Sequence, residues 1–415
     1  MAKLSEILHE RGYVYQHSSE TLEELTDGPK RTLYLGVDPT ADSMHVGQLQ
    51  GILVLRRFIE DGHKLIILIG AGTGMVGDPG GKSAERNLIS DETVDRNGAA
   101  LKKQFTQLLG SVDFQMVNNA DWLRTIPMME FLRDVGKHFT VNEMIKRDSV
   151  RPRLETPDAS ISYTEFSYML LQAYDFLHLH RTLGCDLQVG GSDQWGNIIS
   201  GVDLIRRTEQ KTTYAFSWPL LVDKKTGKKF GKSEKGTVWL DTDKTSPFKF
   251  YQFWLNTDDD SVEEYLLKMT LLSREEIETV MAAHRENPAD RKGQRILATG
   301  VTILVHGADQ AAEAETASQA LFGADSLAEL DDDTITMLKE EVPTCAADAG
   351  NDIIDLIVAS GLASSKREAR QFIEDGAITL NGSKVPESRL LEDADFSHGV
   401  ALMKRGKRNV VILTR

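Results

Sequence analysis

Three separated stretches of the chain carry residue types that suit the binding of phosphate groups. Residues 45–48 (HVGQ) open a segment of helical periodicity, and a helix N-terminus offers N–H groups and a partial positive charge. Lys82 and Arg86 follow a glycine-rich stretch at residues 70–81. Residues 228–233 (KKFGKS) place lysines and a hydroxyl around one glycine, which suits a loop that closes over a polyphosphate. Each stretch taken alone is also explained by an ordinary helix cap, surface turn or solvated loop.

The glycine-rich stretch partly matches two nucleotide-binding motifs but fits neither of them. Gly72, Gly74 and Gly77 match the spacing of a dinucleotide fingerprint, but residues 78–81 (DPGG) continue the loop where a fingerprint would open into a helix. Residues 77–83 miss the P-loop spacing by one residue. We therefore predict a long loop that brings Asp78 and the two cations after it to the carboxyl end of a strand. Open α/β sheets bind their ligands at that edge.

A further group of polar residues lies on one predicted helix, residues 163–183. Tyr168, Gln172 and Asp175 fall within about 60° of one another when the helix is drawn at 100° per residue. A buried polar face must be satisfied by a partner. This face is either the wall of a binding site, a stripe turned to solvent, or part of a structural network.

An alternating order of strands and helices would position these residues. Residues 31–38 and 65–69 are predicted as strands, followed by helices that begin at residue 46 and about residue 90. A second crossing has the helix at 163–183, a strand at 186–189, and a Gly-Gly-Ser sequence that opens another helix. This order predicts an α/β fold built on a Rossmann-type doubly wound parallel sheet.

Composition divides the chain into parts. Residues 308–350 contain one basic residue against eleven acidic ones and are rich in alanine, which favours a solvated linker. The predicted parts are a Rossmann-type domain at 1–222 with an inserted helical segment at about 110–160, a KFGKS loop and helical layer at 223–307, an acidic linker at 308–350, and a small C-terminal α+β domain at 351–415.

Two basic clusters are candidates for contacts with nucleic acid. In the C-terminal domain, Ser365 and Glu368 form a capping-box pattern at the start of a helix. The outward side of that helix carries Lys366, Arg367 and Arg370, which is either a phosphate-contacting patch or a merely solvated face. The second cluster lies in the inserted segment and consists of Lys146, Arg147, Arg151 and Arg153.

Length and composition exclude several classes of protein. The chain has 415 residues, a net charge of −15 and a hydrophobic fraction of 40%, enough apolar material for packed cores. Its two cysteines, Cys185 and Cys345, cannot build a disulfide scaffold or a Cys-rich zinc site. The longest apolar run, about residues 65–71, is far shorter than a membrane span, and the N-terminus shows no signal-peptide pattern. We expect a soluble, intracellular protein of several domains.

The motifs are more specific together than singly, because their order along the chain is typical of one family. Four segments follow one another in the order that is typical of class I aminoacyl-tRNA synthetases. They are the DPT–HVGQ segment after the first strand, the loop GxGMVGDPxGKxxxR, residues 190–197 (GGSDQWGN) and KFGKS. The chain resembles the bacterial tyrosyl-tRNA synthetases over nearly its whole length. HVGQ stands where that family has HIGH, and KFGKS stands where it has KMSKS. The sequence departs from these patterns at Gln48, in place of the second histidine, and at Phe230-Gly231, in place of Met-Ser.

The resemblance implies substrate-binding roles for many of these residues. It places Tyr34 and Asp175 at the phenol hydroxyl of a bound tyrosine, a pair for which the sister tryptophanyl enzymes have no use. The other residues that it assigns to tyrosine lie near the ammonium and carboxylate groups: Asp78, Tyr168, Gln172, Gln188 and Gln194. It assigns ATP binding to Gly36, Asp38, Thr40, His45, Gly47, Gln48, Gly191, Asp193 and Lys232.

The implied reaction is activation of L-tyrosine by ATP to tyrosyl-adenylate, followed by transfer to tRNA(Tyr). Positioning and stabilisation of the departing pyrophosphate would be carried by His45, Lys82, Arg86, Lys229, Lys232 and Ser233. The resemblance also implies that ATP binds as its Mg²⁺ complex, without a resident metal site. It implies an S4-like RNA-binding domain at 351–415 and contacts to tRNA from both basic clusters. It further implies a homodimer in the cytoplasm that is not attached to a membrane.

Two other classes of function stay open at this stage. An NAD-dependent dehydrogenase would use Gly72, Gly74 and Gly77, and a noncatalytic relative would keep only the binding of RNA. Such a scaffold would have little need of His45, Lys82, Lys229 and Lys232. Pyrophosphate exchange that depends on tyrosine would separate these alternatives.

Overall fold

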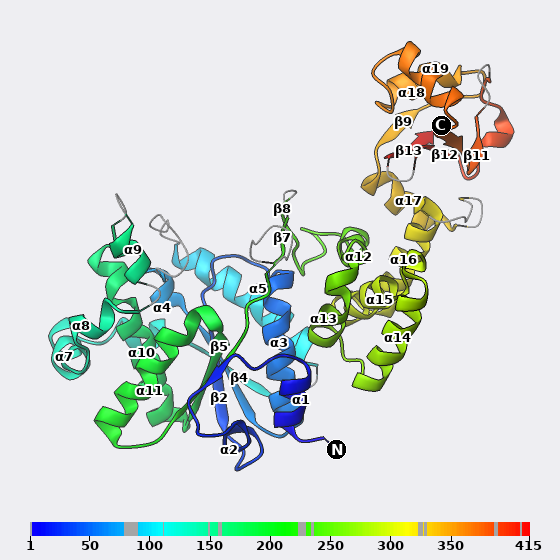
Figure 1. The fold of residues 1–415 in the computed structure, drawn as a ribbon. Helices are drawn as coiled ribbons and strands as arrows, with labels where there is room; N and C mark the ends of the chain where they lie inside the picture. The colour runs from blue at the N-terminus through cyan, green and yellow to red at the C-terminus, as the bar shows by residue number, and fades with distance from the viewer. Residues whose placement is uncertain are drawn as a thin grey trace. The chain divides into compact units, whose positions relative to one another are not determined.

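The computed structural model of the chain (Figure 1) describes residues 2–78, 90–110, 112–147, 150–156, 160–222, 230–233, 236–322, 327, 330–385, 389–406 and 409–415. Of residues 152, 232 and 233 it describes only the backbone. The chain forms two compact units: a first unit of Met1–Lys244 with Asp258–Gly293, and a second unit of Thr245–Thr257 with Gln294–Arg415. The boundaries predicted after residues 222 and 307 therefore each fall inside a unit.

The first unit is built on one mixed sheet, with strands in the order β1-β6-β5-β2-β3-β4 (Figure 1). The strands are β1 (Gln16–His17), β2 (Thr32–Val37), β3 (Lys64–Ile69), β4 (Phe114–Asn118), β5 (Leu187–Gly191) and β6 (Tyr214–Trp218). All neighbouring pairs are parallel except β1 with β6. Residues 65–69 of β3 are all buried, as expected for a strand covered on both faces. The predicted doubly wound parallel sheet is confirmed, with an added antiparallel edge strand.

Helices cover both faces of this sheet. The face with Tyr34, Ile66 and Leu68 packs on α10 (Tyr163–Leu183) and α11 (Trp195–Glu209). On the other side lie α3 (Val46–Glu60) and α5 (Asp91–Leu109) (Figure 1). Other helices of the unit are α1 (Leu4–Glu10), α2 (Leu22–Thr26), α4 (Ala71–Gly74), α13 (Asp259–Met269) and α14 (Arg274–Glu286). The helix predicted at 163–183 is present with those bounds and is capped by Ser162.

The segment predicted as an insertion, residues 110–160, differs from the prediction in one respect. Its first part is β4, which pairs with β3 and belongs to the main sheet. Only the residues after β4 form the added helical segment: α6 (Ala120–Leu123), α7 (Met128–Asp134), α8 (Val141–Met144) and α9 (Arg151–Glu155). β4 is a short, partly exposed edge strand, so its sequence lacks the continuous apolar run that identifies β3.

The second unit joins helices to a second sheet with strand order β11-β10-β12-β13-β9. Its helices are α12 (Pro247–Leu255), most of α15 (Lys292–His306), α16 (Ala308–Phe322), α17 (Asp332–Glu341), α18 (Ile353–Ala359) and α19 (Lys366–Glu374). Its strands are β9 (Thr344–Ala346), β10 (Ile378–Leu380), β11 (Ser383–Lys384), β12 (Val400–Arg405) and β13 (Asn409–Thr414). No helix in the part of the chain described here is long and apolar enough to cross a membrane.

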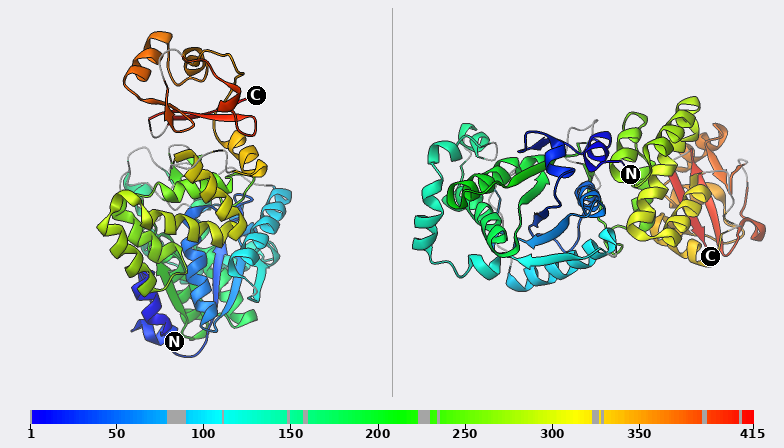
Figure 2. Two further views of the ribbon diagram at one scale, coloured as in Figure 1. Left: turned by 90° about the vertical axis from the view of Figure 1, so that its right-hand side faces the viewer. Right: turned by 90° about the horizontal axis from the view of Figure 1, so that it is seen from below.

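Both faces of this second sheet are buried. Ala401, Met403, Val411 and Leu413 pack on α18 and α19, which lie on one face of the red strands in Figure 2. The alternate residues of the same strands, including Leu402 and Ile412, pack with side chains of α12, α16 and α17. The C-terminal sheet is therefore part of a larger core and not a separately packed module.

The prediction of a solvated acidic linker at 308–350 is wrong over its helices. The alanines of α16 at positions 311, 314, 317 and 320 are buried; their spacing of three places each beside the next along a stripe that winds around the helix. Asp309 and Glu313 of the same helix are exposed, and Asp331 caps α17. Strand β9 then pairs with β13. Small side chains allow close helix packing, so the low hydrophobicity of this segment concealed a folded structure.

Candidate functional site

A cavity of about 410 Å³ lies in the first unit, at the carboxyl ends of β2 and β5. These two strands are neighbours where the connections turn to opposite sides, which is where open α/β sheets bind ligands. The cavity is lined by every residue predicted for tyrosine and, apart from Lys232, every residue predicted for ATP: Tyr34, Gly36, Asp38, Thr40, His45, Gly47, Gln48, Asp78, Tyr168, Gln172, Asp175, Gln188, Gly191, Asp193 and Gln194.

At the inner end of the cavity, the Asp175 carboxylate is held by two donors. It is 2% exposed; Asn119 Nδ2 donates to Oδ2 at 2.9 Å, and Trp122 Nε1 donates to Oδ1 at 2.7 Å. Burial raises the pKa of Asp175 to about 7 against the opposing effect of these hydrogen bonds. The folded protein therefore favours the protonated form of Asp175. The contribution of this protonated carboxyl to stability is fully present below about pH 4 and is lost as the pH rises to about 7.

The sequence analysis did not single out Asn119 or Trp122. Asn119 also donates to Thr73 Oγ1 at 3.0 Å and accepts from Gly72 N at 2.7 Å, so it joins the glycine-rich stretch to the cavity floor. Trp122 stacks on His178 of α10 with ring centroids 4.3 Å apart. Both residues follow the carboxyl end of β4. Recognition of β4 as a sheet strand would have pointed to them.

Two polar atoms in the cavity wall have no hydrogen-bond partner among the described residues: the Tyr34 hydroxyl and Gln188 Oε1, both buried. The two residues are directly paired across β2 and β5, and their side chains share one face of the sheet. Burial and the nearby Asp175 raise the pKa of Tyr34 well above its ordinary value, so its hydroxyl stays protonated. Buried polar groups are normally satisfied, so these atoms indicate where a polar ligand completes the site.

A second set of polar contacts lines the cavity nearer the ends of the strands. The Tyr168 hydroxyl donates to both carboxylate oxygens of Asp38 at 3.4 Å, and Thr73 Oγ1 donates to Asp38 at 3.3 Å. Gln194 Nε2 donates to Asp78 Oδ2 at 2.7 Å. Asp38 and Asp78 make this part of the cavity acidic, which favours a ligand that carries a positive charge.

The HVGQ segment forms the N-terminal turn of α3. His45 is the N-cap, and its Nδ1 accepts from Gly47 N at 3.1 Å. Gln48 Oε1 accepts from His45 N at 3.0 Å, which completes a capping box. Gln48 thus fixes the turn through its oxygen and keeps its amide N–H groups on the cavity wall, where they can donate to a ligand.

The other predicted phosphate-binding residues are only partly described. Lys82, Arg86 and Lys229 lie outside the described residues, and Lys232 and Ser233 are described only as the backbone of β7 (Lys232–Ser233), which pairs with β8 (Gly236–Thr237). Phe230, between these lysines, is buried and lines the cavity. The KFGKS segment therefore reaches the same cavity as HVGQ.

The basic cluster of the inserted segment is not uniform. The Arg153 guanidinium donates to Glu165 at 3.3 to 3.4 Å, and both side chains are largely buried, so Arg153 differs from the expected solvent-facing group. Lys146 and Arg151 are exposed, and Arg147 is partly exposed. On α19, Lys366, Arg367 and Arg370 are all exposed on the side away from the core, and Lys366 forms an ion pair with Asp355.

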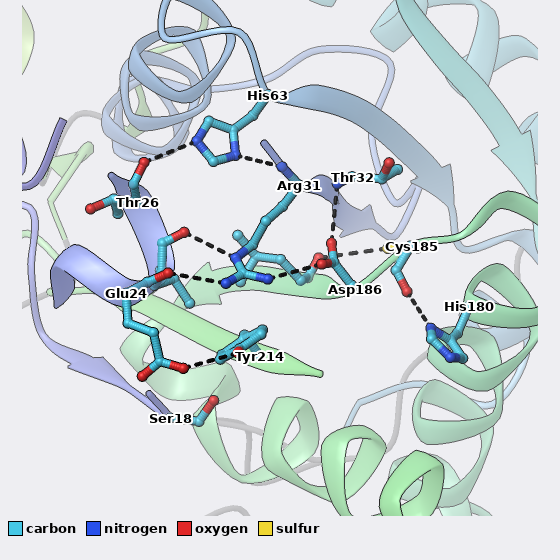
Figure 3. A network of polar contacts seen from close by, with 12 residues as sticks. Ser18, Glu24, Thr26, Arg31, Thr32, His63, His180, Cys185, Asp186 and Tyr214 are labelled. Carbon is cyan, nitrogen blue, oxygen red and sulfur yellow. Dashed lines mark hydrogen bonds and ion pairs between the residues drawn. The ribbon is translucent and has the colours of Figure 1, made fainter. Parts of the chain in front are cut away.

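A separate polar network lies at the opposite, amino ends of the strands (Figure 3). The Arg31 guanidinium donates to the carbonyl oxygens of Glu24 and Leu25 and to Asp186, and it lies 3.9 Å from the centre of the Tyr214 ring. His63 accepts from Arg31 N, and burial lowers the pKa of His63. Because every polar group of Arg31 is used within the fold, this network ties the strand ends together and offers no ligand site.

The comparisons with known proteins agree with this fold and cavity. A model of the family described as tRNA synthetases class I (W and Y) matches residues 26–323, and one for the tyrosine–tRNA ligase SYY-like C-terminal domain matches residues 334–413. The tyrosine–tRNA ligases of Roseiflexus castenholzii and Staphylococcus carnosus are each 46% identical, with 99% and 96% of this chain and 98% and 96% of the relative covered. A C-terminally truncated mitochondrial tyrosyl-tRNA synthetase of Aspergillus nidulans has a TM-score of 0.69 at 32% identity, covering 78% of this chain and 95% of that chain.

Fold, cavity and family match together define a class I tRNA synthetase of the tryptophan and tyrosine type. The resemblance inferred from the order of the motifs is thus confirmed. Because the relatives match over nearly the whole chain, the chain belongs to the family of the bacterial tyrosine–tRNA ligases.

Proposed function

We propose that this chain activates L-tyrosine with ATP and transfers it to tRNA(Tyr) in the cytoplasm. The observation that carries the proposal is the inner end of the cavity, where the unpartnered Tyr34 hydroxyl lies near the oriented Asp175 carboxylate. A phenol hydroxyl entering there donates to the carboxylate and accepts from Tyr34. An indole or a phenyl ring has no oxygen to place between these groups, and would leave them unpaired.

The acidic middle of the cavity suits the ammonium group of the same substrate. Asp78, Tyr168 and Gln172 line the cavity, and we place Gln188 and Gln194, which also line it, near the substrate carboxylate. The tyrosine carboxylate is itself the nucleophile toward the α-phosphate of ATP, so no residue of the chain has to supply one. The work of the protein is to align the two substrates and to stabilise the charge on the departing pyrophosphate.

The ATP part of the proposal uses the outer cavity. His45 and Thr40 would meet the γ-phosphate at the N-terminus of α3, and Asp193 would hold the ribose. Lys82, Arg86, Lys229, Lys232 and Ser233 would close over the pyrophosphate. In the described part of the chain, no three His, Cys, Asp or Glu side chains come together to hold a metal. We propose, from the family resemblance, that Mg²⁺ arrives bound to ATP.

Pyrophosphate exchange with each of the twenty amino acids tests this function directly. Exchange of labelled pyrophosphate into ATP should depend on tyrosine. Exchange driven equally well by tryptophan, or absent with all twenty amino acids, would contradict the proposal. A charging assay with tRNA(Tyr) then tests the transfer step.

The pKa of Asp175 predicts the pH dependence of tyrosine activation. The substrate phenol donates to an ionised carboxylate, and Asp175 is protonated below its pKa of about 7. We expect kcat/KM for tyrosine to rise with pH and to level off above about pH 7, because kcat/KM reports on groups of the free enzyme. The pH profile of pyrophosphate exchange measures this limb. A limb that persists unchanged in Asp175→Asn would assign the titration to another group.

Tyr34→Phe should separate ligand recognition from stability. The Tyr34 hydroxyl is buried without a partner, so its removal should leave the melting temperature of the ligand-free protein unchanged or raise it. The preference for tyrosine over phenylalanine should fall by about 0.5–1.5 kcal/mol, the value of one neutral hydrogen bond. Calorimetry and kcat/KM for both amino acids measure the two effects. A large loss of stability would mean that the hydroxyl serves the fold.

We also propose that the protein is a homodimer that uses α7 and α8. No side chain of α7 is buried, and Met128 and Met129 are 71% and 77% exposed. Phe131 of α7 and Met144 of α8 share a small core, and Val141 at the start of α8 is 60% exposed. Exposed apolar side chains gathered on one element mark an interface.

Met129→Asp combined with Val141→Asp should convert the dimer to a monomer in sedimentation equilibrium, because two charges would be buried without partners. Ile303→Asp, which alters a half-exposed apolar residue of α15, serves as the matched control and should leave the mass unchanged. A double variant that stays dimeric would place the interface elsewhere.

A further inference from the structure

The two residues at which KFGKS departs from its family pattern are fixed against the HVGQ turn. Phe230 N donates to Leu221 O at 3.0 Å, and Val238 N donates to Gly231 O at 3.1 Å, so backbone hydrogen bonds hold the Phe230–Gly231 dipeptide on both sides. A Cβ atom on Gly47 would lie 2.9 Å from the Phe230 carbonyl oxygen. The dipeptide thus rests directly on the first turn of α3.

Gly231 allows this close approach. Its φ of +84° is in the left-handed region, and a Cβ atom there would lie 2.7 Å from Val46 Cγ2. A serine, as in the family pattern, would meet both backbone strain and a collision. Glycine at this position is therefore part of the contact between the two signature segments.

The Phe230 side chain anchors the dipeptide to a different element, α13. Its ring lies 4.8 Å from that of Tyr265, and the two side chains are only 7% and 5% exposed. The C-terminal end of α13 is itself held by the N-terminal region. Arg11 donates to the carbonyl oxygens of Leu267 and Thr270 at 2.7 and 2.8 Å, and the Tyr13 hydroxyl donates to Lys268 O at 2.9 Å.

We propose that Tyr265 is a positioning residue for tyrosine activation, which acts on the KFGKS motif through Phe230. The motif lysines, Lys229 and Lys232, are bonded in sequence to the two ends of the fixed dipeptide. Removal of the ring contact frees the Phe230–Gly231 dipeptide to shift, and both lysines are joined to it in sequence. In the proposed function both lysines stabilise the departing pyrophosphate. A shift of the dipeptide therefore weakens transition-state stabilisation, while the tyrosine end of the cavity is unchanged. This inference rests on the proposed function.

The test compares Tyr265→Leu, Tyr265→Phe and Leu266→Ala. Tyr265→Leu removes the ring contact, Tyr265→Phe keeps it, and Leu266→Ala removes buried apolar volume from the same helix, since Leu266 is fully buried. In single turnovers, Tyr265→Leu should lower the rate constant of adenylate formation by about 10- to 100-fold, the size of effect expected from a misplaced catalytic group. The dissociation constant for tyrosine should stay within about twofold. Tyr265→Phe should restore the rate, and Leu266→Ala should lower stability without this kinetic effect.

A double variant shows whether Tyr265 acts through Phe230. Phe230→Leu should reproduce the loss in rate, and Phe230→Leu combined with Tyr265→Leu should be no slower than Phe230→Leu alone, because both changes remove one contact. Multiplied rate losses in the double variant would overturn the inference, as would a wild-type rate in Tyr265→Leu. If wild-type protein showed no tyrosine-dependent exchange, the proposed function itself would fail, so the wild-type measurement comes first.

Discussion

Asp175→Asn should lower kcat/KM for tyrosine in pyrophosphate exchange by at least about 10²-fold, the largest effect expected of any single substitution in the cavity. Asn119 and Trp122 both donate to the carboxylate, and the substrate phenol is a third donor. A side-chain amide offers only one acceptor oxygen, and its own NH₂ would face one of these donors. The variant therefore loses a charge-assisted hydrogen bond to substrate and leaves a buried donor unpaired.

Trp122→Phe is the matched test of how Asp175 is oriented. It removes one donor to the carboxylate but keeps an aromatic ring beside His178. Because that hydrogen bond stabilises the ionised form, its loss should raise the pKa of Asp175 further and move the acidic limb of the pH profile upward. If Asp175→Asn kept the wild-type preference for tyrosine over phenylalanine, the phenol would bind elsewhere and the tyrosine assignment would lose its main physical support.

Removal of residues 351–415 should abolish the charging of tRNA while tyrosyl-adenylate formation continues. The cavity lies wholly in the first unit, and the deleted residues carry the exposed basic side of α19. The deletion also uncovers apolar side chains such as Phe248 and Leu321, which pack with Leu402 and Ile412. We therefore expect lower solubility and a lower melting temperature for what remains of the second unit.

Arg367→Ala combined with Arg370→Ala separates RNA contact from packing. Both side chains are exposed, so the cores of the second unit should stay intact. Affinity for tRNA should fall, and the slope of log K against log salt should decrease by roughly 0.7 to 0.9 for each phosphate that the variant no longer neutralises. A folded truncation that charges tRNA at the wild-type rate would contradict the assignment of this domain. Unchanged tRNA affinity in the double variant would move the RNA-binding site to another surface.

The central part of the fold could be predicted because its sequence patterns are strong. The apolar run at 65–69 and the helix predicted at 163–183 are elements that the structure contains with nearly the same bounds. The order of the glycine-rich stretch, HVGQ and KFGKS then indicated one family. Asp78 could be placed beside the cavity without a structure, because it follows a strand and open α/β sheets bind ligands at the carboxyl edge. Tyr34 of β2 and Asp175 of α10 were assigned to one site by the family resemblance alone.

The parts that the sequence did not predict are those in which tertiary packing outweighs local pattern. Edge strand β4 alternates too weakly to stand out, so Asn119 and Trp122, which lie just beyond it, went unnoticed. In α16, buried alanines look like the composition of a linker, because their contribution comes from close packing and not from hydrophobicity. Arg153 was grouped with its basic neighbours, since nothing local signals its ion pair with Glu165.

The path of the chain between the two units sets an order for folding during synthesis. Helix α12 belongs to the second unit, but the chain then returns to the first unit for α13 and α14 before it leaves again. Phe248 of α12 shares an apolar core with Ile412 of β13, which is synthesised long after α12. At the usual synthesis rate of about 5 to 20 residues per second, the apolar side of α12 stays without these packing partners for roughly 10 to 30 s. During that interval the apolar side of this helix is open to a chaperone or to aggregation.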